Sequence, residues 1–478
     1  MLQMTKEYLK NGRNIDDIVE QAKTILRKRQ ANYERYVRKA PQELKAPLEY
    51  YIDNIGTGYF AGKEPKYTIK QEKDKTKKDI IKNLFGKVVG ENANAEEMQQ
   101  IIDFIRDYND DSNFFYEIVM DYMTTGACCW INYETDTNEI VYSKVSSLQS
   151  VAIYDYSTPV QLIGGIRIWQ EKDNDGFDCD KVEVITDEDK RYYKNSKKQP
   201  KTYKEIPEEL EEVKWSLAPF YSVENPDNLA LHEPVITLID AYETVITNNK
   251  HLFEYNDNAK LKITGFTPNN ELMTEDEDGK MIKNPERIKE DEAILEAPTF
   301  YTPDASGDIE WIIKDVNDTA SENHKKSLIE LILMCSMIPS ISEISTTEKT
   351  ATEIERSFFP LEQVLARADK LFKKELLRMW ENIFNRVNIK KKTKFDFREI
   401  KIDLQRNLPT DKSAMVDLAL KLREVLSDET VLNMLPFDID IQSELAKKQE
   451  ENEINMDSFI NKQKEEENGL EQSGQGIE

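Results

Sequence analysis

The stretch GTGYFAGKE at residues 56–64 is the part of this sequence closest to a phosphate-binding loop. Such a loop carries glycine, four further residues and then Gly-Lys-Ser/Thr, so that backbone N–H groups surround the phosphates and the hydroxyl holds a metal ion. Here Thr57 stands where the first glycine is required, and Glu64 follows Lys63 where the hydroxyl is required. Because a carboxylate at that place repels phosphate, the sequence predicts a glycine-bearing turn between a helix and a strand.

The histidines and cysteines show no spacing that binds a metal ion or activates a nucleophile. His232, His251 and His324 are scattered and have no cysteine or carboxylate at ligand spacing. The adjacent Cys128 and Cys129 lie in the strand-like run TTGACCWINYE, which indicates small buried residues. Acidic residues are so abundant that no acid/base pair can be singled out. The sequence therefore predicts no catalytic residue, no metal site and no cofactor, and we do not expect an enzyme.

The length and charge of the chain limit the remaining possibilities. At 478 residues the chain exceeds the size of one hydrophobic core, so two to four domains are expected. The formal net charge of −26 repels nucleic acid and anionic membranes on average, so any nucleic-acid contact has to be local. The N-terminus lacks the apolar core of a secretory signal, and the longest apolar stretch, LIELILMCSMI, is too short to span a bilayer. Together with four sparse cysteines, these features predict a soluble intracellular protein.

The N-terminal half contains helical and strand-like patterns. Helices are predicted over residues 15–40 and 96–124. The Lys/Arg cluster at 27–39 is interpreted as a solvated or partner-facing helix surface, with phosphate contact as the alternative. Strand patterns dominate from 127 to about 204, in runs such as EIVYSKV and LIGGIRIWQ that are separated by turn sequences. This half is predicted to be a mixed α+β unit.

A long amphipathic helix is predicted next, over residues 234–258, with Pro234 in its first turn. Its apolar stripe consists of Val235, Leu238, Tyr242, Val245 and Leu252, with Ile239, Ile246 and Phe253 beside it. Its opposite, polar side is predicted to consist of Asp240, Glu243, Thr247, Lys250, Glu254 and Asp257. Asn249 and Asn256 interrupt the apolar stripe. At about 1.5 Å per residue, this helix extends on the order of 30–35 Å.

The remaining sequence predicts an insert, two helices and a tail. Residues 266–318 are polar and acidic, and a second helix is predicted over 319–338, where a proline ends it. The Ser/Thr-rich segment 340–350 is predicted to be a loop. The longest helix is predicted from about 352 to 387, with a kink at Pro360. The end of the chain loses its apolar residues and is predicted to be disordered.

This plan, together with several residue patterns, resembles the portal proteins of tailed bacteriophages of the siphophage type. YYIDNIGTGYFAGKEP is similar to the family's early helix and turn, and IIDFIRDYNDDSNFFYEIVMDYMTTGACCWINYETDTNEI to its helix and glycine-centred turn into strands. The most specific stretch, PFYSVENPDNLALHEPVITLIDAYETVITNNKHLFEYNDNAKLKITG, resembles the entry to the stem. LKLREVLSDETVLNMLPFDIDIQSELAKKQEENE resembles the C-terminal crown region. The likeness covers nearly the whole chain, although ISEISTTEKTATEIE lacks the glycines that the family often has there.

The resemblance implies an α+β portal fold with a mixed α+β wing, a two-helix stem, a small clip insert, a long kinked helix and an α-helical crown. The implied parts are the wing at 1–233, the first stem helix at 234–262, the clip at 263–318, the second stem helix at 319–339, the channel loop at 340–351, the long kinked helix with a return strand of the wing at 352–408, and the crown with a disordered acidic tail at 409–478.

The resemblance also implies a ring, usually of twelve subunits, that is assembled in the bacterial cytoplasm and occupies the portal vertex of the virion. Double-stranded DNA passes through such a ring without sequence-specific contacts during packaging and ejection. The implied partners are the terminase, the major capsid and scaffolding proteins and the head-completion or adaptor proteins, and no membrane. The loop residues expected near DNA are Ser345, Thr346, Thr347 and Lys349. The residues expected to pack in the stem are Leu238, Tyr242, Val245 and Leu252.

Three alternatives stay open at this point. The loop residues are also compatible with an ordinary solvated loop. A phage-assembly enzyme, such as a nuclease or an ATPase, requires a phosphate loop or clustered carboxylates on strands, and the sequence offers neither. A cytoplasmic helical scaffold of phage assembly that forms no ring would leave the mixed α+β half without a role.

Overall fold

The computed structural model describes most of the chain outside several loops and the C-terminal part. The described residues are 2–10, 14–37, 44–69, 95–172, 176–196, 199–257, 260–264, 271–275, 280–296, 308–312, 318–340 and 351–408, with short pieces at 416, 419–422, 431–432, 444 and 447. The chain divides into two compact units. The first comprises residues 1–338 and 367–404, and the second comprises 339–366 and 405–478.

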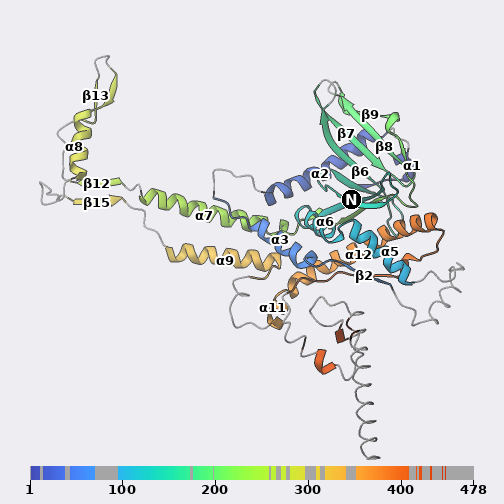
Figure 1. Ribbon diagram of the computed structural model, residues 1–478. Coiled ribbons are helices and arrows are strands. Elements are labelled where there is room, and N and C mark those ends of the chain that lie inside the picture. The colour runs from blue at the N-terminus through green and yellow to red at the C-terminus, as the bar shows by residue number, and fades with distance from the viewer. Residues whose placement is uncertain are drawn as a thin grey trace, which may run out of the picture. The chain divides into compact units, whose positions relative to one another are not determined.

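A seven-stranded sheet forms part of the first unit (Figure 1). The strand order is β1, β5, β6, β7, β8 and β10, with β9 paired to β8. The strands are β1 Leu2–Gln3, β5 Ser150–Tyr154, β6 Leu162–Lys172, β7 Asp178–Ile185, β8 Asp189–Ser196, β9 Gln199–Glu205 and β10 Glu211–Glu212. The pairing of β1 with β5 is parallel, whereas the other pairs are antiparallel. The predicted strand-rich region is therefore confirmed.

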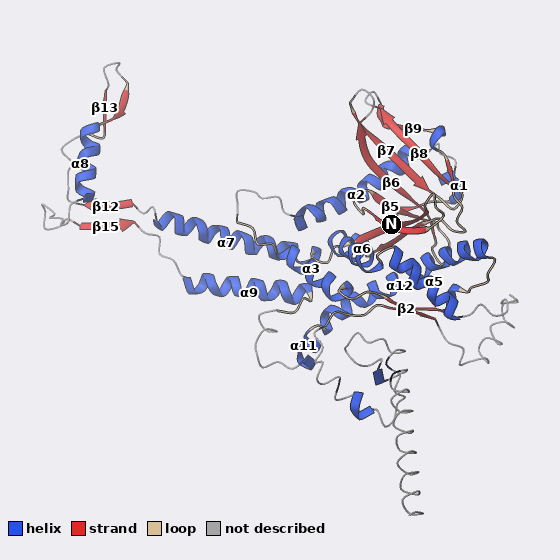
Figure 2. Ribbon diagram, in the orientation of Figure 1, coloured by secondary structure: helices blue, strands red, loops and turns tan. Residues whose placement is uncertain are grey.

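Helix α2, Ile15–Val37, covers one face of this sheet (Figure 2). Its residues Ile18, Val19 and Ala22 are buried in one cluster with strand residues such as Val151 and Val182. The short helix α1, Lys6–Lys10, precedes it. The other face of the sheet packs on a three-stranded sheet of β11 Phe220–Glu224, β3 Ala127–Glu134 and β4 Ile140–Val145. Apolar residues at helical spacing thus place α2 as the sequence predicts.

The helix predicted over residues 96–124 consists of two helices, α5 Ala95–Tyr108 and α6 Asp111–Thr125. They are separated at Asp110, whose φ of 47° is left-handed and ends α5. Asparagine and aspartate adopt this conformation at lower cost than other residues with a side chain, since their short polar groups bond locally. The single-helix prediction is therefore wrong in this detail, and the Asn-Asp-Asp sequence at 109–111 explains the break.

The glycine-bearing segment 56–64 mostly belongs to a helix. Helix α3, Leu48–Ala61, includes Gly56 and Gly58, and only the residues from Gly62 onward turn into β2, Lys66–Ile69. The predicted turn is thus confirmed only for its last residues. Strand β2 pairs antiparallel with β16, Ile400–Asp403, so segments that are far apart in the sequence meet at this edge.

The long helix α12, Phe359–Lys391, forms the centre of the core in the first unit. From residue 367 onward its predicted apolar stripe is buried, and consists of Ala368, Phe372, Leu376, Met379, Ile383 and Val387. The Phe372 ring contacts the rings of Phe60, Phe115 and Tyr122. The predicted kink at Pro360 is a break, because a single residue, Phe358, separates helix α11, Ala351–Ser357, from α12. Proline supplies no N–H, so it fits the first turn of α12.

Helices α7, Ile236–Asp257, and α9, Asp318–Ser336, lie side by side and project away from the sheets (Figure 1). A 3-10 turn, Glu233–Val235, precedes α7, which places Pro234 just before the helix. Between the two helices lies an insert with the antiparallel pair β12 Lys260–Thr264 and β15 Asp308–Ile312. The insert also contains the hairpin β13 Met273–Glu275 with β14 Met281–Lys283, and helix α8, Pro285–Glu296.

The second unit contains α11 and the first residues of α12. The Glu362 carboxylate accepts two hydrogen bonds from the Arg406 guanidinium, at 2.8 and 2.9 Å. Residues 419–422 are helical. The predicted disordered tail lies outside the described residues. With helices and sheets in one unit, the predicted α+β class is confirmed, and the finer division into wing, stem, clip and crown stays a prediction.

Candidate functional site at the paired helices α7 and α9

The two long helices run antiparallel and are tied by a polar contact near their far ends. The Asn249 side-chain amide of α7 donates to the Ser321 hydroxyl of α9 at 2.7 Å. Because Asn249 lies late in α7 and Ser321 early in α9, the helices run in opposite directions. Nearer the sheets, Ile239 of α7 and Ile332 of α9 are buried. The asparagine that interrupts the apolar stripe is therefore part of the contact between the helices.

The buried sector of α7 is bracketed by contacts on both sides. Asp240 accepts from Arg35 of α2 at 2.6 Å, and the Thr247 hydroxyl donates to the Leu44 carbonyl at 3.4 Å. Successive residues of a helix are turned by about 100°, so Asp240 and Thr247 point to one side of α7 and Asn249 points to the opposite side. The sector of the helix surface between these two sides includes Ile239 and Glu243. Glu243 is indeed buried, so its prediction as part of the polar side is wrong.

The four predicted packing residues lie at the margin of this sector. Leu238, Tyr242, Val245 and Leu252 are all half-buried. Phe253, predicted beside the stripe, is 55% exposed. Packing of these residues against a neighbouring subunit stays a prediction. The four loop residues predicted to contact DNA, Ser345, Thr346, Thr347 and Lys349, lie outside the described residues, since α9 is followed by described backbone only as far as residue 340.

The segment that leads from β11 into α7 is fixed on the end of α6. Gly126 ends α6 with a left-handed φ of 77°, and its carbonyl accepts from the Asn225 N–H at 2.8 Å. The Leu231 N–H donates to the Met123 carbonyl at 2.8 Å. A Cβ at Gly126 would lie 2.4 Å from the backbone carbon of Asn228, so only glycine permits this close approach.

A buried guanidinium completes this anchorage. Arg29 of α2 is 0% exposed and donates to the Ser147 and Ser150 carbonyls at 3.1 and 2.7 Å. It also donates to the Asn228 amide oxygen and to the Glu224 carboxylate, both at 3.0 Å. The interpretation of the whole 27–39 cluster as an exposed helix surface is therefore wrong for Arg29. Its helical phase with Ala22 and Leu26, both buried, was the signal available in the sequence.

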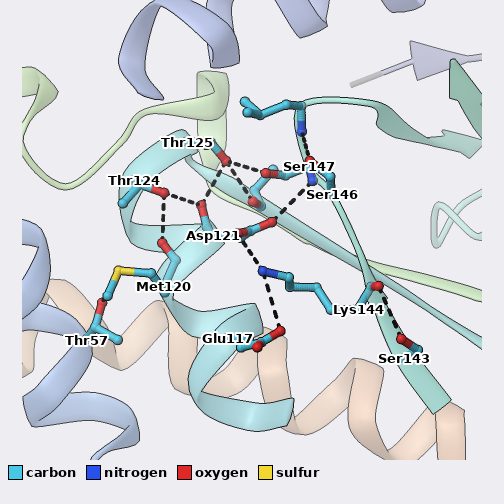
Figure 3. A network of polar contacts seen from close by, with 12 residues as sticks. Thr57, Glu117, Met120, Asp121, Thr124, Thr125, Ser143, Lys144, Ser146 and Ser147 are labelled. Carbon is cyan, nitrogen blue, oxygen red and sulfur yellow. Dashed lines mark hydrogen bonds and ion pairs between the residues drawn. The ribbon is translucent and has the colours of Figure 1, made fainter. Parts of the chain in front are cut away.

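The end of α6 is also tied to the turn between β4 and β5 (Figure 3). The Asp121 carboxylate accepts from the Ser147 N–H at 3.2 Å and from the Lys144 ammonium at 3.4 Å. The Thr125 hydroxyl lies 3.1 Å from the Ser147 hydroxyl and 2.8 Å from the Asp121 carbonyl. Sequence patterns did not single out this network, which joins side chains about 22 positions apart.

Beneath the first turn of α7 lies a set of charged side chains that we call the joint cluster: Arg35, Glu49, Asp53, His232 and Asp240. His232 Nδ1 lies 2.7 Å from Asp53 Oδ2, and both side chains are 0% exposed. Arg35 bonds the buried Glu49 at 3.1 Å and also Asp240. Burial raises the pKa of Asp53 to about 6, and the negative charge of Glu49 adds to this increase, whereas the hydrogen bond and charge of His232 oppose it.

Among the described residues, no three or more histidine, cysteine, aspartate or glutamate side chains are placed so that they could hold a metal ion together. Cys128 and Cys129 are buried, as predicted, and burial raises the pKa of Cys129 to about 11, which disfavours the reactive thiolate. Throughout the part of the chain that the structure describes, each helix is too short or too polar to cross a membrane.

Comparison with known proteins decides the family. The family model of the phage portal protein, SPP1 Gp6-like, matches residues 1–457. The chain belongs to this family. The resemblance drawn from the sequence is thereby confirmed. No curated protein matches the chain.

Among solved structures, this portal-family chain is similar to one from the neck of an empty gene transfer agent particle, with 10% identity, 82% of this chain and 91% of that chain covered, and a TM-score of 0.42. It is also similar to one from the virion of a native gene transfer agent particle, with 11% identity, 86% and 94% covered, and a TM-score of 0.42. At these values the structural likeness adds nothing to the family assignment.

Proposed function

We propose that this protein forms the ring-shaped portal of a tailed-phage capsid, through which double-stranded DNA is packaged and later ejected. The match of the portal family model to residues 1–457 carries this proposal. The paired helices α7 and α9 act as the stem, and the insert between them acts as the clip. In this arrangement the protein is part of the virion at the portal vertex, after assembly in the host cytoplasm.

Ring formation is supported by the half-buried row on α7. Leu238, Tyr242 and Val245 lie beside the contact with α9 and are only partly covered by their own chain. Burial of apolar surface is worth about 25 cal/mol per Å², so a second copy that covers this row stabilises the assembly. A head-to-tail contact between identical chains closes into a ring when the rotation between them permits it. Twelve copies is the number that we propose.

Passage of DNA is supported by the charge of the chain. Each cation that binds phosphate adds salt-dependent affinity, and strong binding would hold a moving duplex back. A net charge of −26 keeps such adhesion low. We propose that Ser345, Thr346 and Thr347 touch the DNA backbone weakly, with Lys349 as the cation of the loop, and that no base is read.

The proposed partners follow from the same arrangement. The insert between α7 and α9 docks the terminase and later the head-completion or adaptor proteins, whereas the wing meets the major capsid and scaffolding proteins. The described part of the insert has exposed apolar residues, including Leu272 and Met281, that suit such contacts. The protein has no enzymatic activity of its own in this proposal.

Electron microscopy of the purified chain in negative stain tests the proposal. Closed rings with a central hole are expected, and analytical ultracentrifugation should show one large species. A chain that sediments only as a monomer across concentration and salt would contradict the portal function and would favour a scaffold that forms no ring. Nucleotide hydrolysis by the pure chain would favour a phage-assembly enzyme.

A further inference from the structure

Three exposed lysines lie together at the C-terminal end of α12. Lys391 is the last residue of the helix, Lys392 and Lys394 follow it, and we call these three residues the basic turn. None of the three forms an ion pair with a carboxylate of the described residues. The whole chain has 91 acidic and 65 basic residues. In such a chain, three neighbouring cations without a partner form a local patch of positive charge.

Two carboxylates around this end of α12 bond other cations. Glu134 of β3 accepts from the Arg386 guanidinium at 2.9 Å and lies 3.1 Å from the Lys390 ammonium. Asp396 accepts from the Arg398 N–H at 3.0 Å, and its carboxylate lies 3.9 Å from the guanidinium of the same residue. These carboxylates therefore leave the charge of the basic turn uncompensated.

The side chain of Asn388 fixes the backbone of the basic turn. Its amide oxygen accepts from the Thr393 hydroxyl and from the Phe395 N–H, both at 2.9 Å. Its amide nitrogen donates to the Phe395 carbonyl at 2.9 Å, and the Phe395 ring is buried. Consecutive Cα atoms are 3.80 Å apart, so those of Lys391 and Lys394 are separated by at most about 11 Å. The three lysines are thus held close together on a fixed backbone.

The conformation of Lys392 does not suit a lysine. Its φ of 56° is left-handed, and glycine or asparagine usually occupies such a position after a helix, because a Cβ raises the energy of this conformation. The helix macrodipole favours cations in the last turn, which accounts for Lys390 and Lys391, but this effect falls off within that turn. Strained residues are concentrated at functional sites. The strained Lys392 and the more distant Lys394 therefore point to a contact outside the chain.

The type of cation indicates the kind of partner. Protein–protein interfaces are enriched in arginine and aromatic residues and depleted in lysine, whereas interfaces with DNA are strongly positive. The exposed apolar residue beside the basic turn is Ile389, and a single residue of this kind is normal on a protein surface. We propose that the basic turn binds the phosphate backbone of double-stranded DNA and reads no base. This inference rests on the proposed function, which brings such DNA to the protein.

The basic turn is not part of the predicted channel loop. Residues 340–351 precede α11 and α12, whereas the basic turn ends α12, a helix of 33 residues that extends roughly 50 Å. Three phosphate contacts are fewer than the six to ten that make binding to DNA strong. The basic turn therefore holds a duplex weakly, and this hold depends on salt.

Fluorescence anisotropy of a labelled duplex of about 12 base pairs, titrated with the full chain at 50 to 200 mM salt, tests the inference. Each phosphate contact contributes about 0.9 to the slope of log affinity against log salt. The triple variant Lys391→Gln, Lys392→Gln and Lys394→Gln should therefore reduce the slope by about 2.7 for each basic turn that one duplex contacts. Over this range of salt, the affinity of the wild type should fall on the order of 40-fold more than that of the variant. No binding by the wild type at 50 mM salt, or an unchanged slope in the variant, would overturn the inference.

The matched control removes the same charge elsewhere in the first unit. Lys201, Lys204 and Lys214 are exposed and lie in a segment rich in glutamate, and their replacement by glutamine should leave DNA binding unchanged. An equal loss of binding in this control would show that net charge acts, and not the basic turn. Tighter binding of polyglutamate than of the duplex, lost in the triple variant, would replace DNA by an acidic protein as the partner.

A single variant separates binding from folding. Lys392→Gly relieves the left-handed backbone, so its Tm should not decrease, while the salt slope should fall by about 0.9. This variant decides if the triple variant does not fold, and an unchanged slope contradicts the inference.

Electron microscopy of the same samples distinguishes this inference from the proposed function. Rings whose DNA binding is unchanged in the triple variant would contradict the inference and leave the portal function in place. A wild-type chain without rings would contradict the portal function, whereas a loss of DNA binding in the triple variant would still support the basic turn.

Discussion

Replacement of Arg29 by methionine should strongly destabilise the first unit. The guanidinium is 0% exposed and donates to two backbone carbonyls, to Asn228 and to the Glu224 carboxylate. Methionine fills a similar space but leaves Glu224, whose side chain is 6% exposed, without this cation. Removal of one partner of a buried ion pair costs about 3–5 kcal/mol, and the orphaned carbonyls add to this cost. Arg29→Lys should recover part of the loss, since an ammonium keeps the charge but not the planar fork.

Thermal unfolding followed by circular dichroism measures this effect, with a decrease of Tm on the order of 5–10 °C expected for Arg29→Met. The control is Arg27→Met, two positions away in the same basic cluster and exposed, which should change stability by less than about 0.5 kcal/mol. Equal stability of the two variants would refute the reasoning, because it would mean that the buried guanidinium contributes no more than an exposed one.

Four further outcomes are expected. Gly126→Ala should cost about 1–3 kcal/mol for its left-handed φ, with an additional backbone clash, whereas Gly58→Ala, whose added Cβ meets nothing within 4 Å, should be neutral or stabilising in the same melt. Leu238→Asp should weaken ring assembly in analytical ultracentrifugation; unchanged rings would remove this residue from the interface. Lys349→Glu should reduce DNA retention in a packaging assay while rings still form, and normal full heads would show that it does not act on DNA. Lys63→Ala should leave any phosphate release from ATP unchanged, and a loss of hydrolysis would reveal a nucleotide site.

The elements of this fold were predictable where apolar residues repeat at a fixed spacing. The stripe of α12, from Ala368 to Val387, keeps steps of three and four and is buried throughout. The break between α5 and α6 was missed because the apolar pattern continues across it, although the Asn-Asp pair before Asp111 is a turn signal. The spacing of apolar residues indicates which face of a helix is buried. It does not indicate that a single residue between two helices has a left-handed backbone.

The partners of the buried charges were beyond the reach of local patterns. Arg29 lies 199 positions from Asn228, and Asp53 lies 179 positions from His232. A charged group is buried only where a partner of this kind is in place. Whether a given arginine or aspartate is buried therefore depends on a contact that forms only in the folded chain. Local sequence therefore favours an exposed surface for the same residues. The helical phase of Arg29 indicated its burial, but nothing in the sequence indicated its partners.

Helix α7 shows that an apolar pattern can also point away from the main contact within the chain. Its contacts within the chain are centred on the buried Ile239 and Glu243 and are bracketed by the polar contacts of Asp240 and Asn249, so the buried sector includes a charged residue. The regular apolar row that begins at Leu238 lies at the margin of this sector, and its own chain covers it only in part. The most regular apolar row of α7 is therefore not its main contact within the chain. This row leaves apolar surface that another molecule can cover. In the ring that we propose, a second copy of the same chain covers this row at every position.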